Sequence, residues 1–125
     1  MEKIELYDLI DSCNGCRLGS ININSNRHKP WGYEKSLFML AGQNPSSSAS
    51  SDDGEKFFFS KKTDNATFLR NYHLLEETFK SVGIDFHTMW KTNVQKCKYS
   101  SNDEFDVQCF SVCRKEIFNE ELEFV

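Results

Sequence analysis

The apolar residues of this chain follow two kinds of spacing, and each kind predicts a different element of secondary structure. Short continuous apolar runs at 36–41 and 88–94 are typical of strands that are buried on both faces. Residues 122–125 resemble the opening of a third strand. Because stretches of helical spacing separate these runs, we expect a parallel sheet whose strands are joined by helical crossovers.

Apolar residues three or four positions apart predict three helices. The first covers residues 2–12 and leads into the first cysteine of the chain. The second begins at a cap at 63–64 and ends at Gly83, and the third begins at 102–103. The polar, asparagine-rich stretch 20–30 predicts a loop between the first helix and the first strand.

Composition and charge are typical of a single globular domain. The chain has 125 residues, of which 38% are apolar and 14% are aromatic, enough to form a hydrophobic core. Its net charge is −4, so contact with nucleic acid would require a local basic patch. No apolar run approaches the ~18 residues of a membrane span, and the first residues lack the apolar segment of an export signal. We therefore expect a cytoplasmic protein, or a nuclear one in a eukaryotic host, with no membrane partner.

The cysteines favour a metal centre over disulfides. Disulfides are rare in a reducing compartment, and the odd number of cysteines would leave one unpaired. Cys13 and Cys16 form a CxxC motif whose internal glycine lets two thiolates turn toward one centre. Cys97 and either Cys109 or Cys113 could complete a set of four, which fits a structural Zn²⁺ ion or an iron–sulfur cluster. A redox CxxC pair and inert buried thiols are the alternatives.

Cationic side chains surround the third cysteine. Lys96 and Lys98 flank Cys97, so we expect them to lower the pKa of its thiol and favour the thiolate that a metal needs. Basic residues near this point could also form a local face for nucleic acid, although a solvated surface is the alternative. The candidates for this face are Lys91, Lys96, Lys98, Arg114 and Lys115.

Several motifs, taken in their order along the chain, resemble the iron–sulfur class of uracil-DNA glycosylases, often called family 4. They are CNGCRLG at 13–19, GQNPS at 42–46, DGEKFFF at 53–59, TNVQKCK at 92–98 and CFSVCRKEI at 109–117. The resemblance implies a partial three-layer α/β/α fold with a short parallel sheet. Residues 1–125 would form a single uracil-DNA glycosylase-like domain that lacks the C-terminal part of the family.

The resemblance also implies a [4Fe–4S] cluster held by Cys13, Cys16, Cys97 and Cys109. Cys113 is the alternative fourth ligand, because its distance from Cys97 also fits longer members of the family. Such a cluster would be structural and would pin the N-terminal arm to the last helix. Zn²⁺ is the alternative metal.

An enzyme that acts on a base in duplex DNA must extrude the nucleotide and hold it in a pocket. Asn93 lies at the carboxyl end of the second predicted strand, where open α/β sheets bind ligands, and its amide can pair with a uracil edge. The resemblance gives Phe57 or Phe58 the role of stacking on the base, and it assigns Gly42 to the loop at the sugar. A turn-capping asparagine and a buried run of phenylalanines are the alternative interpretations.

The loop that begins at Gly42 should place a water molecule near the sugar carbon. Here the chain differs from the iron–sulfur class, since Gln43 stands where that class has Glu and Asn44 where it has Ala. In related classes an Asn or Asp orients the water, so Asn44 is the catalytic candidate, with Gln43 supporting it. A neutral amide cannot act as a general base, so we expect slow chemistry. A plain Asn-Pro turn is the alternative.

Family members continue to a histidine-containing loop that stabilises the departing uracil anion, and this sequence has no such segment. His28, His73 and His87 match no family position, and we expect His28 and His73 to be solvated. The implied activity is hydrolysis of the N-glycosidic bond of uracil in DNA, in base excision repair. The chain would be a truncated relative, an inactive remnant, or one part of an enzyme that a second polypeptide completes. The alternative is a non-catalytic iron–sulfur or zinc module that binds nucleic acid or a protein partner.

Overall fold

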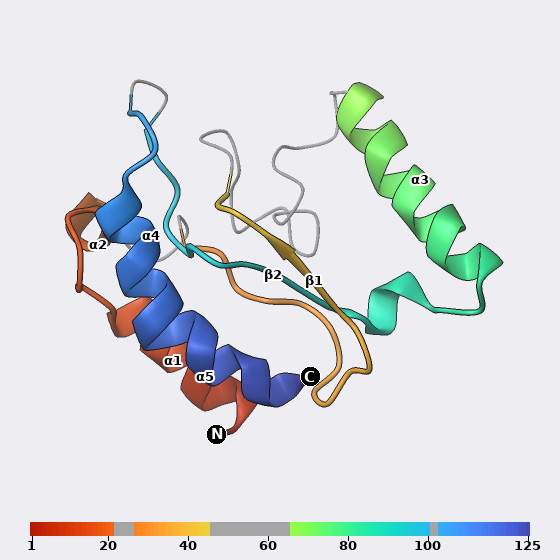
Figure 1. Cartoon of the computed structure of the whole chain (residues 1–125), viewed down its shortest axis with the longest axis horizontal. Coiled ribbons are helices and arrows are strands. Elements are labelled where there is room, and N and C mark those ends of the chain that lie inside the picture. The colour runs from red at the N-terminus through yellow and green to blue at the C-terminus, as the bar shows by residue number, and fades with distance from the viewer. Residues whose placement is uncertain (22–26, 46–65, 101–102) are drawn as a thin grey trace.

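The computed structural model describes residues 1–21, 27–45, 66–100 and 103–125 (Figure 1). In these ranges helices surround a short, two-stranded parallel sheet. The arrangement confirms the mixed α/β class that the apolar spacing predicts. No helix of the described part is long and apolar enough to cross a membrane.

The sheet consists of β1 (Met39–Gly42) and β2 (Trp90–Asn93), which run parallel to each other. In their register the first residues of the two strands lie opposite each other, and so do the last, Gly42 and Asn93. All of β2 is buried, whereas β1 is partly exposed. The predicted parallel pairing is confirmed, although the paired segments are shorter than the two apolar runs.

A segment that the sequence predicts as part of a loop runs along the other side of β2. Arg27 forms an antiparallel bridge with Cys97, and Trp31 forms one with Lys91. The backbone N–H of Trp31 donates to the Lys91 carbonyl at 2.9 Å. β2 therefore has backbone partners on both edges, which accounts for its complete burial.

The N-terminal part forms the predicted first helix, α1 (Lys3–Ser12), followed by the short α2 (Leu18–Ile21). α1 begins with a capping box in which the side chains of Glu2 and Glu5 each accept a backbone N–H of the other residue. The sequence between the two helices carries the CxxC motif, so the cysteine loop is held at both ends by helical backbone.

The helix between the strands is α3 (Ala66–Ser81), and its predicted cap at 63–64 lies outside the described residues. Gly83 follows it with a φ of 80°, the left-handed conformation that glycine adopts past the end of a helix. A 3₁₀ turn, η3 (Phe86–Thr88), then leads into β2. This part has its own core cluster, made of Tyr72, Phe86 and Met89.

The C-terminal part is one continuous helical stretch. Its pieces are α4 (Val107–Cys113), a π-helical turn (Arg114–Phe118), α5 (Asn119–Glu121) and the 3₁₀ turn η5 (Leu122–Phe124). The side chain of Asp106 caps its start by accepting the backbone N–H groups of Gln108 and Cys109. The helix therefore begins later than the start at 102–103 that the sequence predicts.

The predicted third strand at 122–125 is wrong, since residues 122–124 continue the helical stretch. Phe124 stacks on Trp90 of β2, with ring centroids 4.8 Å apart and planes inclined by 10°. Short apolar runs do not distinguish a strand from a buried helical turn. In the helical form Phe124 contacts Trp90, a residue far away in the sequence.

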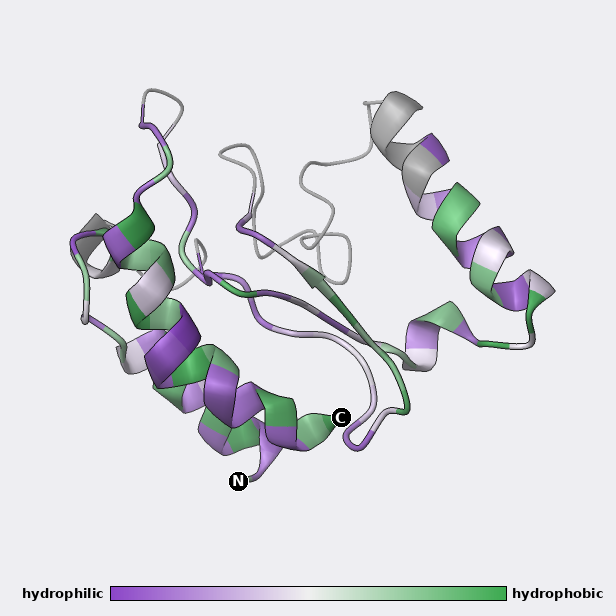
Figure 2. Ribbon diagram, in the orientation of Figure 1, coloured by the Kyte–Doolittle hydropathy of each residue, from purple (hydrophilic) through white to green (hydrophobic). Residues whose placement is uncertain are grey.

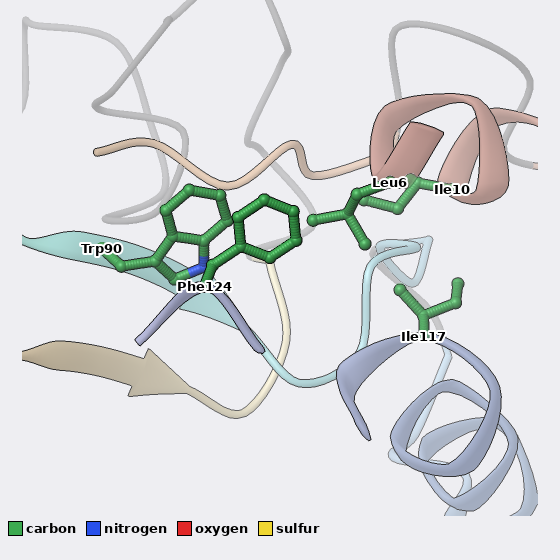
Figure 3. Close-up of a cluster of buried hydrophobic side chains, with 5 residues drawn as sticks. All are labelled: Leu6, Ile10, Trp90, Ile117 and Phe124. Carbon is green, nitrogen blue, oxygen red and sulfur yellow. The ribbon is translucent and has the colours of Figure 1, made fainter. Parts of the chain in front are cut away.

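The main core unites three distant parts of the sequence (Figure 3). Its buried side chains are Leu6, Ile10, Trp90, Ile117 and Phe124. Burying each such side chain stabilises a fold by about 1.5–3 kcal/mol. Figure 1 shows α1 beside the C-terminal helices on one side of the strands, with α3 on the other. Hydrophobic and hydrophilic residues alternate along these helices, as expected for helices with one buried side (Figure 2).

Candidate metal centre and base-binding site

The five cysteines lie on three segments that the fold brings together. Cys13 caps the end of α1, and Cys16 precedes α2. Cys97 follows β2, whereas Cys109 and Cys113 are buried residues of α4. Cys97 and Cys109 belong to one buried cluster, and Cys16 packs against that cluster. Thiols from the N-terminal arm, from the end of β2 and from the last helix thus meet in one region.

The thiols also influence one another electrostatically. Burial raises the pKa of Cys97 to about 12; the guanidinium of Arg27 opposes this rise, and the thiols of Cys113, Cys16 and Cys13 add to it. Charge interactions therefore link Cys97 to the CxxC motif and to Cys113. A metal that binds here must displace protons from thiols whose pKa values are high.

Cys109 and Cys113 have different neighbours. Burial raises the pKa of Cys109 to about 12, and a hydrogen bond with Cys16 adds to the rise. Burial also raises the pKa of Cys113; a backbone hydrogen bond at Lys96 opposes the rise, while Cys16 and Cys13 add to it. Cys113 therefore interacts with both thiols of the CxxC motif, whereas the thiol contact of Cys109 is with Cys16. Both remain candidates for the fourth ligand.

The expectation that Lys96 and Lys98 lower the pKa of the Cys97 thiol is wrong. Burial dominates at this thiol, and Arg27 is the cation that opposes it. The Lys96 ammonium binds the carboxylate of Glu121 instead. Sequence neighbours of a cysteine do not necessarily lie beside its sulfur, because successive side chains point in different directions.

The donor set fits a thiolate-bound metal, although its arrangement is not that of a formed site. In the described ranges no group of three His, Cys, Asp or Glu side chains is positioned to hold a metal ion. Buried thiols are nevertheless the ligands that zinc and iron–sulfur centres prefer. A cavity of about 400 Å³, lined in part by Cys16 and Cys109, opens beside them and provides a route of entry.

An ion pair holds the CxxC loop to the last helix. Arg17, directly after the motif, donates from Nε to Asp106 Oδ2 at 3.0 Å. Asp106 is also the N-cap of α4, so its carboxylate connects the loop to the helix that carries Cys109. Both side chains are partly exposed, and the pair contributes little to stability by itself.

The second group of candidate residues lies at the carboxyl ends of the two strands. Gly42 and Asn93, the last residues of β1 and β2, are opposite each other. Past this point the backbones stay paired, since Val94 N–H donates to the Gly42 carbonyl at 2.9 Å and Gln95 N–H to the Gln43 carbonyl at 3.0 Å. The loop that starts with Gly42 and the segment that carries Asn93 therefore leave the sheet side by side.

Asn93 is buried, with 1% of its surface exposed, and its side-chain Nδ2 has no hydrogen-bond partner within the described residues. Its backbone N–H donates to His28 Nδ1 at 3.2 Å. A buried donor without a partner costs about 1–3 kcal/mol, so few are retained without a reason. The amide is therefore in a state that a hydrogen-bonding ligand would stabilise.

His28 is fully buried, so the expectation of a solvated histidine is wrong. Burial lowers its pKa well below the usual value, and the charges of Lys96 and Lys29 lower it further. The neutral ring accepts from Asn93 through Nδ1, and the backbone N–H of His28 donates to the Lys96 carbonyl at 2.6 Å. His73, by contrast, is exposed as expected.

The remaining candidates of the base-binding site are less well placed. Asn44 is half-buried, and its Nδ2 donates to the Pro45 carbonyl at 3.0 Å, as in a local Asn-Pro turn. Gln43 is exposed. Phe57 and Phe58 lie outside the described residues, so their predicted stacking role stays a prediction.

The predicted basic face is wrong for two of its five residues, because Lys91 and Lys96 are completely buried. Lys91 Nζ donates to the carbonyls of Phe86 and Met89 at 2.7 and 2.8 Å. Arg114 and Lys115 are exposed, but the two buried ammonium groups cannot contact a phosphate backbone.

Lys96 is the centre of a buried polar network. Its ammonium binds Glu121, donates to Thr92 Oγ1 at 2.6 Å and contacts the Asn93 carbonyl. The indole N–H of Trp90 donates to the other oxygen of Glu121 at 2.7 Å. Glu121 had no distinguishing feature in the sequence, where the neighbouring pair of glutamates is typical of a solvated helix surface.

We expect Lys96→Met to destabilise the protein by about 3–5 kcal/mol, because it leaves the Glu121 carboxylate buried without its cation. The double variant Lys96→Met/Glu121→Gln should recover much of this loss, since Gln can still accept from Trp90. Urea unfolding of the metal-free protein measures both. Glu120→Gln, on the exposed neighbour, is the matched control and should change stability by less than about 0.5 kcal/mol. A single variant as stable as this control would contradict the role of the pair.

No protein-family model matches this chain, and no curated protein is significantly similar to it in sequence. Two features of the structure bear on function: thiols from three segments meet, and the buried Nδ2 of Asn93, at the carboxyl edge of the sheet, has no partner among the described residues.

Proposed function

We propose that this chain is a uracil-DNA glycosylase-like domain with a thiolate-bound iron–sulfur centre. It binds uracil in DNA and hydrolyses the N-glycosidic bond, alone or together with a second polypeptide that completes the fold. The observation that carries the proposal is the position of Asn93. Asn93, whose Nδ2 has no partner among the described residues, lies opposite Gly42, where two parallel strands end, and its strand leads directly to Cys97.

The Asn93 amide suits recognition of a pyrimidine edge. An amide both donates and accepts hydrogen bonds, as does the edge of uracil. The buried surroundings strengthen such bonds and penalise a ligand that cannot form them. Because Asn93 is covered in the described arrangement, an extruded base would have to displace part of this cover when it enters.

The proposed centre is a [4Fe–4S] cluster held by Cys13, Cys16, Cys97 and either Cys109 or Cys113, with Zn²⁺ as the alternative metal. Bound there, the metal would supply a cross-link between three segments of the chain and no step of the reaction. The protein side chains supply burial, and the soft sulfur donors select the metal. The same centre would keep the end of β2, and therefore Asn93, in place.

Hydrolysis requires a water molecule at the sugar carbon as the bond to uracil breaks. The water oxygen forms the new bond to that carbon, its proton goes to solvent, and uracil leaves with the bonding electrons. Asn44 and Gln43 are the groups that would orient the water. Neither amide can remove a proton, so the rate would be lower than with a carboxylate at the same place.

The outer edge of the sheet supports two further parts of the proposal. These are a polypeptide that completes the fold and a three-layer α/β/α architecture. Among the described residues β1 pairs with β2 on one edge, and no described strand pairs with its other edge. Leu37 and Phe38, just before β1, are 89% and 47% exposed. Apolar side chains beside a strand edge are typical of a sheet that continues.

Release of uracil from DNA is the measurement that tests the proposed activity. Anaerobically reconstituted protein should form abasic sites in a uracil-containing oligonucleotide and none in the matched thymine oligonucleotide. Asn93→Leu should lower the rate by about 10- to 100-fold, because about 1.5–3 kcal/mol of hydrogen bonding to the base is lost. The same variant should be as stable as the wild type in urea, since it removes a buried Nδ2 donor that has no acceptor among the described residues. Asn119→Leu, on an exposed asparagine, is the control and should leave the rate unchanged.

Absence of base release by fully loaded protein would exclude hydrolysis by this chain alone. Binding to DNA that weakens with salt, without base release, would favour the non-catalytic module instead. Equal rates for Asn93→Leu and the control would remove Asn93 from the site even in an active protein.

Single cysteine variants identify the fourth ligand. We expect Cys13→Ser, Cys16→Ser and Cys97→Ser to lose most of their bound iron and sulfide, because each removes a soft donor from the set. Of Cys109→Ser and Cys113→Ser, one should lose the cluster and the other should retain it. Iron and sulfide per chain, measured after anaerobic reconstitution, give the answer. Full retention by all five variants would contradict the thiolate centre.

A further inference from the structure

A single buried arginine holds the backbone on both sides of the CxxC loop. Arg27 Nη1 donates to the carbonyls of Ile10 at 2.5 Å and Asp11 at 2.8 Å, which lie in the last turn of α1. Its Nη2 donates to the carbonyl of Gly19 at 2.6 Å, in α2. The two cysteines of the motif lie between these attachment points. The planar guanidinium thereby sets the distance between the two ends of the loop.

The backbone of the same arginine pairs with that of the third cysteine, Cys97. The backbone of Arg27 forms an antiparallel bridge with Cys97, and the side chain is 4% exposed. Its positive charge acts on the Cys97 thiol against the effect of burial. Arg27 therefore contacts the CxxC loop through its side chain and the segment of Cys97 through its backbone.

We propose that Arg27 is the positioning residue of the metal centre: its guanidinium clamps the Cys13–Cys16 loop against Cys97 and stabilises the negative charge of the bound thiolates. This inference rests on the thiolate centre of the proposed function. Two properties of arginine are needed together. The first is geometric: the two terminal nitrogens of the guanidinium reach carbonyls on both sides of the loop. The second is the permanent positive charge, which offsets the cost of burying each thiolate.

Substitutions separate the two properties. Arg27→Lys keeps the charge, but a single ammonium nitrogen cannot donate to carbonyls at both ends of the loop as the two guanidinium nitrogens do. Arg27→Gln loses the charge and can still donate to one carbonyl. Lys91→Met is the matched control, because Lys91 is also a fully buried cation that donates to backbone carbonyls, those of Phe86 and Met89.

The experiment measures iron and sulfide per chain, the rate of iron loss to a chelator, and the reduction potential of the loaded centre. We expect iron loss to be about 10- to 100-fold faster in both Arg27 variants than in the wild type, as is usual when a residue that orients metal ligands is removed. The potential should remain near that of the wild type in Arg27→Lys. It should fall in Arg27→Gln, because a nearby positive charge favours the reduced, more negative cluster. Lys91→Met should match the wild type in both measurements.

The outcomes separate this inference from the function on which it rests. Arg27 variants that lose iron no faster than Lys91→Met, with unchanged potentials, would overturn the role of Arg27 and leave the centre standing. A wild-type protein that takes up no iron and no zinc would overturn the centre and the clamp together. If Arg27→Gln does not fold, Arg27→Lys alone decides the clamp through its rate of iron loss.

Discussion

A buried ion pair between Lys96 and Glu121 ties the end of β2 to the C-terminal helical stretch, and the arrangement of the other segments follows from it. The two side chains are 1% and 0% exposed. Burial lowers the pKa of Lys96, while the Glu121 carboxylate acts in the opposite direction and favours the charged ammonium. Each charge is tolerable in this place only because the other is present. The two segments therefore cannot separate without exposing or neutralising both groups.

The same ion pair determines how the candidate site is built. Lys96 directly precedes Cys97 and contacts the carbonyl of Asn93. Glu121 belongs to the helical stretch that begins with Cys109 and Cys113. One polar network thus connects the residues proposed to bind a base with those proposed to bind a metal. A metal at the thiols would reinforce a junction that the protein already forms by itself.

The site contrasts with the core that supports it. In the core, Trp90 uses its ring against Phe124 and its N–H toward Glu121, so that its apolar and polar parts both have partners. At the site, the buried Nδ2 donor of Asn93 lacks a partner among the described residues. An unfavourable local state of this kind is typical of a ligand-binding position, because the ligand removes the cost. This contrast supports a ligand at the carboxyl edge of the sheet.

Local pattern was sufficient for the elements whose formation depends on near neighbours. The apolar spacing predicted α1, α3 and the parallel pair of strands, and the asparagine at the end of β2 was identified from its place after an apolar run. The sequence did not indicate which charged and polar side chains would be buried. Lys96 and Glu121 are 25 residues apart and His28 and Asn93 are 65 apart, and nothing beside them in the sequence indicates these partners. A charged or polar side chain is buried only where tertiary structure supplies its partner. The sequence by itself therefore determined α1, α3, the two strands and the candidate chemistry. Only the tertiary structure decided the form of residues 122–124 and the burial of Lys91, Lys96 and His28.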